Sequence, residues 1–90
     1  MRRLVWTAAA SADRTRALEF IATDNPIAAR RLALALDQAT TRLMAFPQRG
    51  RQGLLPGTRE LVTVPPYVVV YQVQDDAVVI LRVWHAAQDR

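Results

Sequence analysis

The chain has 90 residues, of which 51% are hydrophobic and 22% are charged, a balance typical of a globular protein that excludes intrinsic disorder. It lacks cysteine and has one histidine, which excludes disulfides, thiolate metal sites and histidine clusters, so we expect no cofactor and no metal. The twelve basic residues are all arginine and, with eight acidic residues, give a net charge of +4, which permits an acidic partner or a nucleic acid. This length predicts a single domain over 1–90.

The hydrophobic residues do not form the long runs that membrane segments need. A membrane-spanning helix requires about 18 consecutive apolar residues, and the longest apolar runs here fall well short of that. The apolar part of the N-terminal segment is too short for a signal peptide. We therefore expect a cytoplasmic protein that has no membrane partner.

The first half of the chain predicts a short strand followed by two helices. Residues 3–6, RLVW, predict the strand, and Thr7 is a suitable N-cap for a helix over 8–23. On that helix the apolar face comprises Ala10, Ala17, Phe20 and Ile21, which leaves Asp13, Arg16 and Glu19 on other faces.

A second helix follows almost at once. Asn25 can cap it and Pro26 suits its first position, so we expect a helix over 26–45 that ends before Pro47. Its buried stripe is predicted to be Ala29, Leu32, Leu36, Ala39 and Leu43. The short connection predicts an antiparallel helical hairpin.

The second half of the chain predicts three strands after a loop over 47–57 that holds all three glycines. The strands are expected over 58–64, 67–73 and 77–84, with short links that suit hairpins. The order β-αα-βββ predicts an α+β fold, with the helical hairpin packed on one face of a mainly antiparallel four-stranded sheet. The last strand is almost wholly apolar and should lie inside the sheet, which gives the strand order 1-4-3-2.

Alternation of side chains assigns the residues of the last two strands to faces. A turn at Asp75-Asp76 predicts the pairs Val73–Val78, Tyr71–Ile80 and Val69–Arg82. One face then carries Tyr67, Tyr71, Ile80, Arg82 and Trp84, and the other carries Val68, Val70, Gln72, Val79, Leu81, Val83 and His85. Arg82 and His85 are expected on opposite faces, and which face packs against the helices is left open.

His85 is the only candidate general base in the chain. Cleavage of RNA by acid–base catalysis needs a base, an acid and a cation for the developing phosphorane charge. The predicted neighbours of His85 are valines and a leucine, which argues for a strand-end histidine that bonds the backbone or contacts a partner. Arg82 is expected to face an edge or a partner, or to pair with an acid such as Glu60.

Several segments, taken in order, resemble the RelE/ParE superfamily of type II toxin–antitoxin toxins: DNPIAA, FPQRGRQG, GTRELV, YVVVYQV and ILRVWHAAQD. The resemblance implies a small cytoplasmic bacterial toxin of RelE-like fold that is blocked by an antitoxin encoded beside it. RelE-like members cut mRNA on the ribosome, whereas ParE-like members poison DNA gyrase. RelE-like nucleases usually place an arginine where Val68 follows Tyr67, and often a polar catalytic residue where Ala86 follows His85, so the resemblance favours the ParE-like branch.

This resemblance predicts a toxin that inhibits DNA gyrase by binding and is neutralised by an acidic ParD-like antitoxin in a heteromeric complex. The alternatives are a ribosome-dependent mRNA endonuclease that uses His85, and a degenerate, non-toxic binding module. The predicted partner-binding residues are the arginines in and just after the loop over 47–57, Arg49, Arg51 and Arg59, together with Val68, Val70, Leu81, Arg82, Val83 and His85 of the strands. The simpler interpretation of the loop arginines is a solvated loop.

Overall fold

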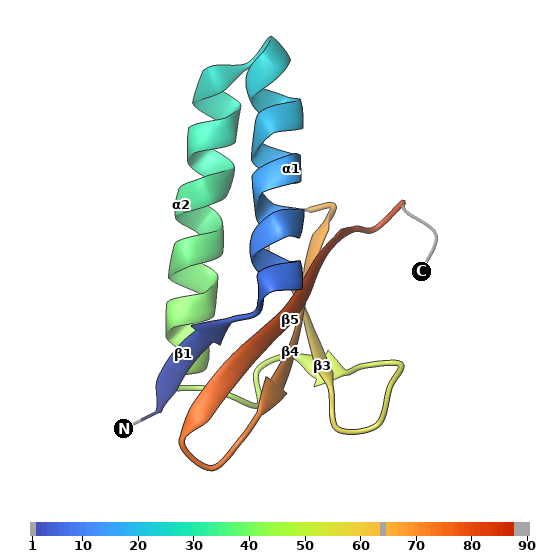
Figure 1. Cartoon of the computed structure of the whole chain (residues 1–90). Coiled ribbons are helices and arrows are strands. Elements are labelled where there is room, and N and C mark those ends of the chain that lie inside the picture. The colour runs from blue at the N-terminus through green and yellow to red at the C-terminus, as the bar shows by residue number, and fades with distance from the viewer. Residues whose placement is uncertain (1, 64, 88–90) are drawn as a thin grey trace.

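The computed structural model describes residues 2–63 and 65–87, and it has the predicted α+β class (Figure 1). Strand β1 is followed by two helices and then by four further strands. Their bounds are β1 Arg3–Trp6, α1 Ala8–Asp24, α2 Pro26–Leu43, β2 Arg51–Gln52, β3 Arg59–Val62, β4 Tyr67–Val73 and β5 Ala77–His85. Among the described residues, neither helix is long and apolar enough to cross a membrane.

The starts of both helices are fixed by the side chains that the sequence suggested. The Thr7 hydroxyl accepts a hydrogen bond from Ala10 N at 3.1 Å, and it also donates one to Ile80 O at 2.9 Å, which ties the start of α1 to β5. The Asn25 side chain accepts from Ala28 N at 3.0 Å, with Pro26 at the first helical position. Helix α2 ends two residues earlier than predicted, at Leu43.

The sheet has five strands in the order β1-β5-β4-β3-β2, with β1 parallel to β5 and the other pairs antiparallel. Four of the strands follow the predicted order. The prediction lacked β2, whose two residues pair with the start of β3, because two residues are too few to give a strand pattern. Strand β3 is shorter than the predicted 58–64, and residue 64 lies outside the described residues.

A β-bulge in the central pair of strands makes the predicted faces wrong for the residues of β5 that follow it. The pairs Val73–Val78 and Tyr71–Ile80 are confirmed, but the register then shifts at Val70/Tyr71, so that Arg82 lies opposite Val70 instead of Val69. The extra residue, Leu81, changes the alternation of the rest of β5. Ile80 consequently shares its face with Val83 instead of with Arg82.

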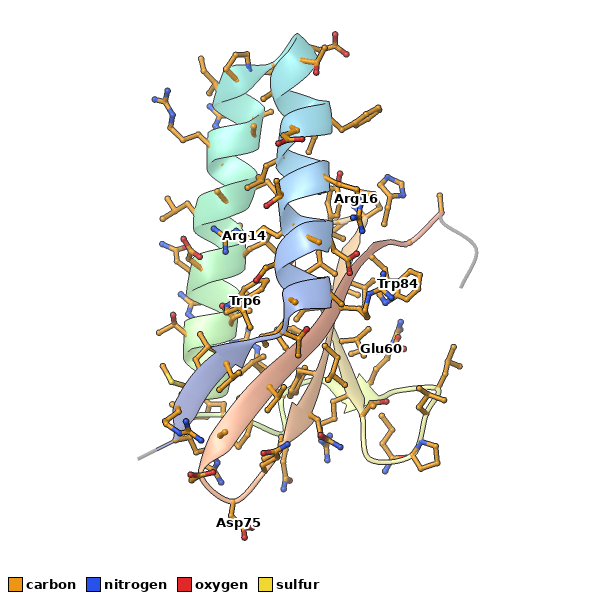
Figure 2. All side chains as sticks on the ribbon, viewed as in Figure 1. Trp6, Arg14, Arg16, Glu60, Asp75 and Trp84 are labelled. Carbon is orange, nitrogen blue, oxygen red and sulfur yellow. The ribbon has the colours of Figure 1, made fainter. Side chains whose placement is uncertain are left out.

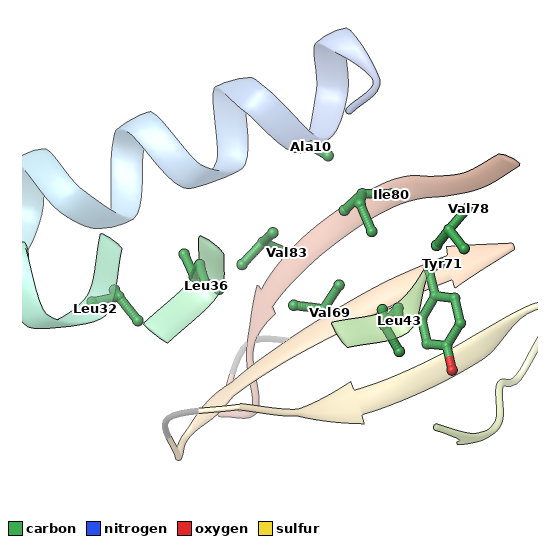
Figure 3. Packing of buried hydrophobic residues seen from close by; sticks show 9 residues of the cluster. All are labelled: Ala10, Leu32, Leu36, Leu43, Val69, Tyr71, Val78, Ile80 and Val83. Atoms are coloured by element: carbon green, nitrogen blue, oxygen red, sulfur yellow. The ribbon is translucent and has the colours of Figure 1, made fainter. Parts of the chain in front are cut away.

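The helices pack on the sheet face that carries Tyr71, and the core lies between them (Figure 3). The cluster of buried hydrophobic residues comprises Ala10, Leu32, Leu36, Leu43, Val69, Tyr71, Val78, Ile80 and Val83. The predicted stripe of α2 is confirmed apart from Ala39, which is only partly buried beside the fully buried Thr40. The opposite sheet face is called the open face below.

Helix α1 differs from its predicted pattern at two positions. Phe20, assigned to the buried face, is 78% exposed, whereas Asp13 is only 8% exposed. Asp13 lies one turn from both Ala10 and Ala17 on the face that meets β5. The small alanines bring the helix close to the strand there, so a carboxylate can reach the strand's backbone.

Candidate functional site

Asp13 joins α1 to the edge of β5 at the point where β1 stops. The pairing of β1 with β5 ends at Trp6–Ile80, which leaves the edge of β5 beyond Ile80 without a neighbouring strand in the described part of the chain. Asp13 Oδ2 accepts hydrogen bonds from Val83 N at 3.0 Å and from Arg82 Nε at 2.7 Å. The Asp13 carboxylate therefore accepts the backbone hydrogen bond that a neighbouring strand would accept at this edge, and it also binds Arg82.

The same carboxylate binds two guanidinium groups. Asp13 Oδ1 accepts from Arg82 Nη2 at 3.0 Å and from Arg16 Nη2 at 2.7 Å. Arg82 is thus held in a two-pronged contact, the strongest geometry for this pair. Arg16 extends from α1 toward the end of β5 (Figure 2).

The surroundings of Asp13 favour its ionised form. Burial raises the pKa of this carboxyl, but the hydrogen bonds from Arg82 and Val83 and the charges of Arg82 and Arg16 outweigh burial, so the pKa of Asp13 is lowered from its ordinary value. The hydrogen bond to Asp13 raises the pKa of Arg82 in turn. The pair therefore stays charged over the whole neutral range.

His85 faces a hollow of about 340 Å³ on the helix side of the sheet. The lining residues are Asp13, Arg16, Ala17, Phe20, Tyr67, Val83 and His85. The imidazole stands edge-on to the ring of Tyr67, with centroids 5.3 Å apart, and its Nδ1 accepts a hydrogen bond from Ala87 N at 3.2 Å. The expected backbone contact is confirmed, but the expected valine and leucine surroundings are wrong, because the bulge moves His85 to the side of Tyr67.

Arg82 and His85 lie on opposite faces, as predicted. Arg82 lines a hollow of about 280 Å³ on the open face, which it shares with Leu54, Leu55, Thr58, Glu60, Val70, Leu81 and Trp84. Its guanidinium carbon lies 4.7 Å from the centroid of the Trp84 ring. The suggested partner Glu60, labelled near Trp84 in Figure 2, pairs with Arg51 at 3.3 Å, and the partner of Arg82 is Asp13.

The strand residues predicted to bind a partner have different degrees of exposure. Val68 and Val83 are only 2% and 6% exposed, and Val83 belongs to the core. Val70 and Leu81 are partly buried in the wall of the open-face hollow. The valines and the leucine among the predicted partner-binding residues therefore do not form one exposed patch.

The three arginines in and just after the segment 47–57 have separate roles. Arg59 Nη1 donates to Gly50 O at 2.8 Å and to Gln48 O at 3.4 Å, so it holds the loop, and Arg51 pairs with Glu60. Arg49 has no ion pair among the described residues. It lines a further hollow that includes Arg42 of α2.

Gly50 anchors this loop where a larger residue would not fit. Gly50 N donates to the hydroxyl of Tyr71 at 2.8 Å, and that hydroxyl donates to Pro47 O at 2.7 Å. A Cβ atom at position 50 would lie 2.7 Å from the Tyr71 hydroxyl and 2.8 Å from Glu60 O. The loop therefore passes close against β3 and β4, and glycine is required there.

Asp13, Arg16 and Arg42 were not among the predicted site residues. The i, i+3 spacing of Asp13 and Arg16 gave a signal for a helical ion pair. Their contact with β5 depends on a bulge that the sequence pattern did not show. Within the ranges that the structure describes, no group of three or more histidine, cysteine or acidic residues could hold a metal ion.

Comparison with known proteins identifies the class. The family model for the ParE toxin of type II toxin–antitoxin systems, parDE, matches residues 4–90. The chain therefore belongs to the ParE toxin family, and its RelE/ParE-type toxin fold is confirmed.

Individual relatives are similar over almost their whole length. Toxin RelE2 of Caulobacter vibrioides is 47% identical over 89 residues, covering 98% of this chain and 99% of that toxin. Toxin RelE1 of the same organism is 33% identical over 85 residues, covering 90% and 89%. A structure described as the chromosomal ParDE TA system from P. aeruginosa is 25% identical, with a TM-score of 0.83 over 94% of this chain and 96% of that one.

Proposed function

We propose that this toxin acts by binding DNA gyrase and not by hydrolysis. The observation that carries the proposal is that Asp13 binds the guanidinium groups of both Arg16 and Arg82, at 2.7 Å each. A nuclease needs a cation that is available to the phosphorane. Of these two arginines, only Arg16 lines the hollow of His85, and releasing it would leave part of a buried carboxylate's charge uncompensated.

The proposal includes a ParD-like antitoxin as the neutralising partner. The P. aeruginosa structure that this chain resembles is of a ParDE system, and the matching family model is that of the parDE toxin. The net charge of +4 suits an acidic partner. Antitoxin and toxin would form a heteromeric complex in which the toxin is inactive.

A second candidate function is ribosome-dependent cleavage of mRNA. It is favoured by one observation: an imidazole, a phenol and a guanidinium, from His85, Tyr67 and Arg16, line the same hollow. The Caulobacter relatives are also named RelE. The hollow thus offers His85 as a base, Tyr67 as an acid and Arg16 as a cation, and Arg16 is bound to Asp13.

Two assays of the purified toxin separate these functions. Binding to gyrase should reduce supercoiling by gyrase and leave translated mRNA intact. Replacement of His85 by alanine should then weaken inhibition by no more than about tenfold, because it removes at most one contact. Loss of a general acid or base would reduce a cleavage rate by about 10²–10⁴-fold. Cleavage of mRNA by the wild type that is lost in a folded His85→Ala variant would contradict the gyrase proposal. A chain whose expression without the antitoxin has no effect on growth would be the degenerate, non-toxic module.

A further inference from the structure

The turn between β2 and β3 exposes two leucines beside the open-face hollow. Leu54 and Leu55 are 78% and 70% exposed, and both line that hollow together with the apolar side chains of Val70, Leu81 and Trp84. Single exposed leucines are common on protein surfaces. Two of them together at the rim of an apolar hollow are typical of an interaction surface.

Hydrogen bonds within the turn hold these leucines in place. Gly53 N donates to Thr58 O at 2.8 Å, and the Thr58 hydroxyl donates to Leu55 O at 2.6 Å. Gly57 has a φ of 80°, in the left-handed region that favours glycine. The turn is therefore ordered before any partner binds, and little conformational entropy would be lost when a partner covers the leucines.

Arg82 and Trp84 add to this hollow two side-chain types that often dominate protein interfaces. The Arg82 guanidinium lies over the Trp84 ring, and Asp13 binds it through Nε and Nη2. Nη1 of Arg82 makes no hydrogen bond within the described residues, so it can donate to a partner while Arg82 stays bound to Asp13. The buried carboxylate of Asp13 therefore positions a hydrogen-bond donor on the open face in advance of binding.

The two ion pairs at this hollow present their positive ends to solvent. The Arg82 side chain is 42% exposed, whereas that of its partner Asp13 is 6% exposed. In the second pair the Arg51 side chain is 63% exposed and that of Glu60 is 7% exposed. A partner would therefore meet guanidinium groups next to an apolar hollow. This combination suits an apolar side chain that has a carboxylate beside it.

We propose that the open-face hollow, with Leu54 and Leu55 at its rim, is the surface that binds gyrase, an inference that rests on the gyrase target of the proposed function. A gyrase segment would place an apolar side chain against the two leucines and Trp84. A carboxylate or a backbone carbonyl of the same segment would accept a hydrogen bond from Arg82 Nη1. This surface shares no lining residue with the hollow of His85, so the imidazole lies outside the proposed contact.

The chemistry of this surface favours a protein over a nucleic acid or a second copy of the toxin. Phosphates would bind the arginines but would leave the two leucines in contact with water. The Arg82 guanidinium already lies over the Trp84 ring, where a nucleobase would stack. A second copy of this chain would bring two molecules of net charge +4 and their exposed guanidinium groups together, which is unfavourable.

Charges introduced at the two leucines test the surface without altering the core. Leu54→Glu/Leu55→Glu should raise the toxin concentration that half-inhibits supercoiling by purified gyrase by about 100-fold or more, because apolar contacts are replaced by charges that repel an acidic segment. The matched control is Ile27→Glu/Leu34→Glu, which makes the same change in charge at two exposed apolar positions of α2. It should raise that concentration by less than about fivefold, because only the long-range field changes. Thermal unfolding verifies that both variants fold, and equal losses of inhibition would overturn the proposed surface.

A single introduced thiol tests occupation of the surface directly, because the chain has no cysteine of its own. Alkylation of Leu55→Cys by a maleimide, followed by the mass of the toxin, should slow by at least about tenfold when gyrase is bound, because the contact excludes water and reagent. Alkylation of Leu34→Cys should slow much less. Unchanged alkylation of Leu55→Cys in a gyrase complex that has formed would overturn the inference. Protection by the antitoxin or by a second copy of the toxin in place of gyrase would also overturn it.

The wild-type toxin distinguishes this inference from the proposed function. If the wild type neither binds gyrase nor reduces supercoiling, the gyrase function fails and the gyrase surface fails with it. If the wild type and Leu54→Glu/Leu55→Glu reduce supercoiling at the same concentration, only the open-face surface fails, and inhibition of gyrase stands.

Discussion

At the scale of single residues, Asp13 connects helix α1 to strand β5. Its carboxylate completes the edge of β5 through Val83 N and fixes Arg82, which in turn lies over Trp84. The charge is almost buried, with a side-chain exposure of 6%, so each hydrogen bond to it matters more than a surface contact does. Arg82 is thereby oriented on the open face without being available as a free cation.

Removing the charge of Asp13 should destabilise the fold in a pH-dependent way. Asp13→Asn should reduce the free energy of unfolding at pH 7 by about 2–3 kcal/mol, because hydrogen bonds to a charged group are lost. The lowered pKa of Asp13 means that the folded state favours the ionised carboxyl. The stabilisation is therefore complete above about pH 4 and is lost as the pH falls through the folded-state pKa.

Denaturant unfolding of both proteins between pH 2.5 and pH 7 checks this expectation. The difference between wild type and Asp13→Asn should shrink as the solution becomes acidic. The control is Asp37→Asn, because the Arg14–Asp37 pair is largely exposed at Asp37 and should contribute less than about 1 kcal/mol. A difference that is independent of pH would argue against a charged role for Asp13.

At the scale of elements, the segment 47–57 is held against the sheet by the hydroxyl of Tyr71. Tyr71 is fully buried, and its hydroxyl connects Gly50 N with Pro47 O. This anchor positions the segment that carries Arg49 and leads into β2. The position of Arg49, and so the shape of the hollow that it lines with Arg42, therefore depends on a contact made from β4.

Replacing Tyr71 by phenylalanine should destabilise the toxin by about 1–3 kcal/mol, because Gly50 N and Pro47 O would lose their shared partner inside the protein. Thermal unfolding measures the change. Tyr67→Phe is the matched control, since the hydroxyl of Tyr67 has no hydrogen bond within the described part of the chain, and it should cost well under 1 kcal/mol. Similar losses in both variants would contradict the anchoring role.

At the scale of the whole molecule, two helices cover one face of a twisted sheet, and α2 supplies much of the apolar contact. Leu36 and Leu43 are fully buried against a cluster that includes Val69, Tyr71 and Ile80. The stability of a 90-residue domain is small, about 5–15 kcal/mol, so this layer of side chains determines whether the toxin folds.

Truncation of Leu36 should therefore remove a large share of the stability. Leu36→Ala is expected to lower the free energy of unfolding by about 2–5 kcal/mol, through lost burial and a cavity. Leu34→Ala, on the same helix at a side chain that is 58% exposed, should change it by less than about 1 kcal/mol. Chemical denaturation of the two variants compares them, and equal effects would show that the core was wrongly located.

The contrast between local and distant determinants explains which predictions were confirmed. The caps at Thr7 and Asn25 and the stripe of α2 depend on residues a few positions apart, and they were predictable. The surroundings of His85 and the partner of Arg82 depend on the bulge and on contacts between residues 69 positions apart. The alternation of apolar and polar side chains gives no signal for the extra residue in β5. Every prediction of a cross-strand neighbour for a residue after Leu81 was therefore wrong.

The last strand of the chain lies between the first strand and the rest of the sheet. On the ribosome, β1 leaves the tunnel long before β5 has been translated, and β5 is the one strand that pairs with β1 among the described residues. The hairpin of α1 and α2 can form early, but until β5 emerges, part of its apolar surface has no strand to cover it. Completion of the native sheet therefore waits for β5, and a nascent chain stalled before Ala77 cannot assemble the surfaces described above.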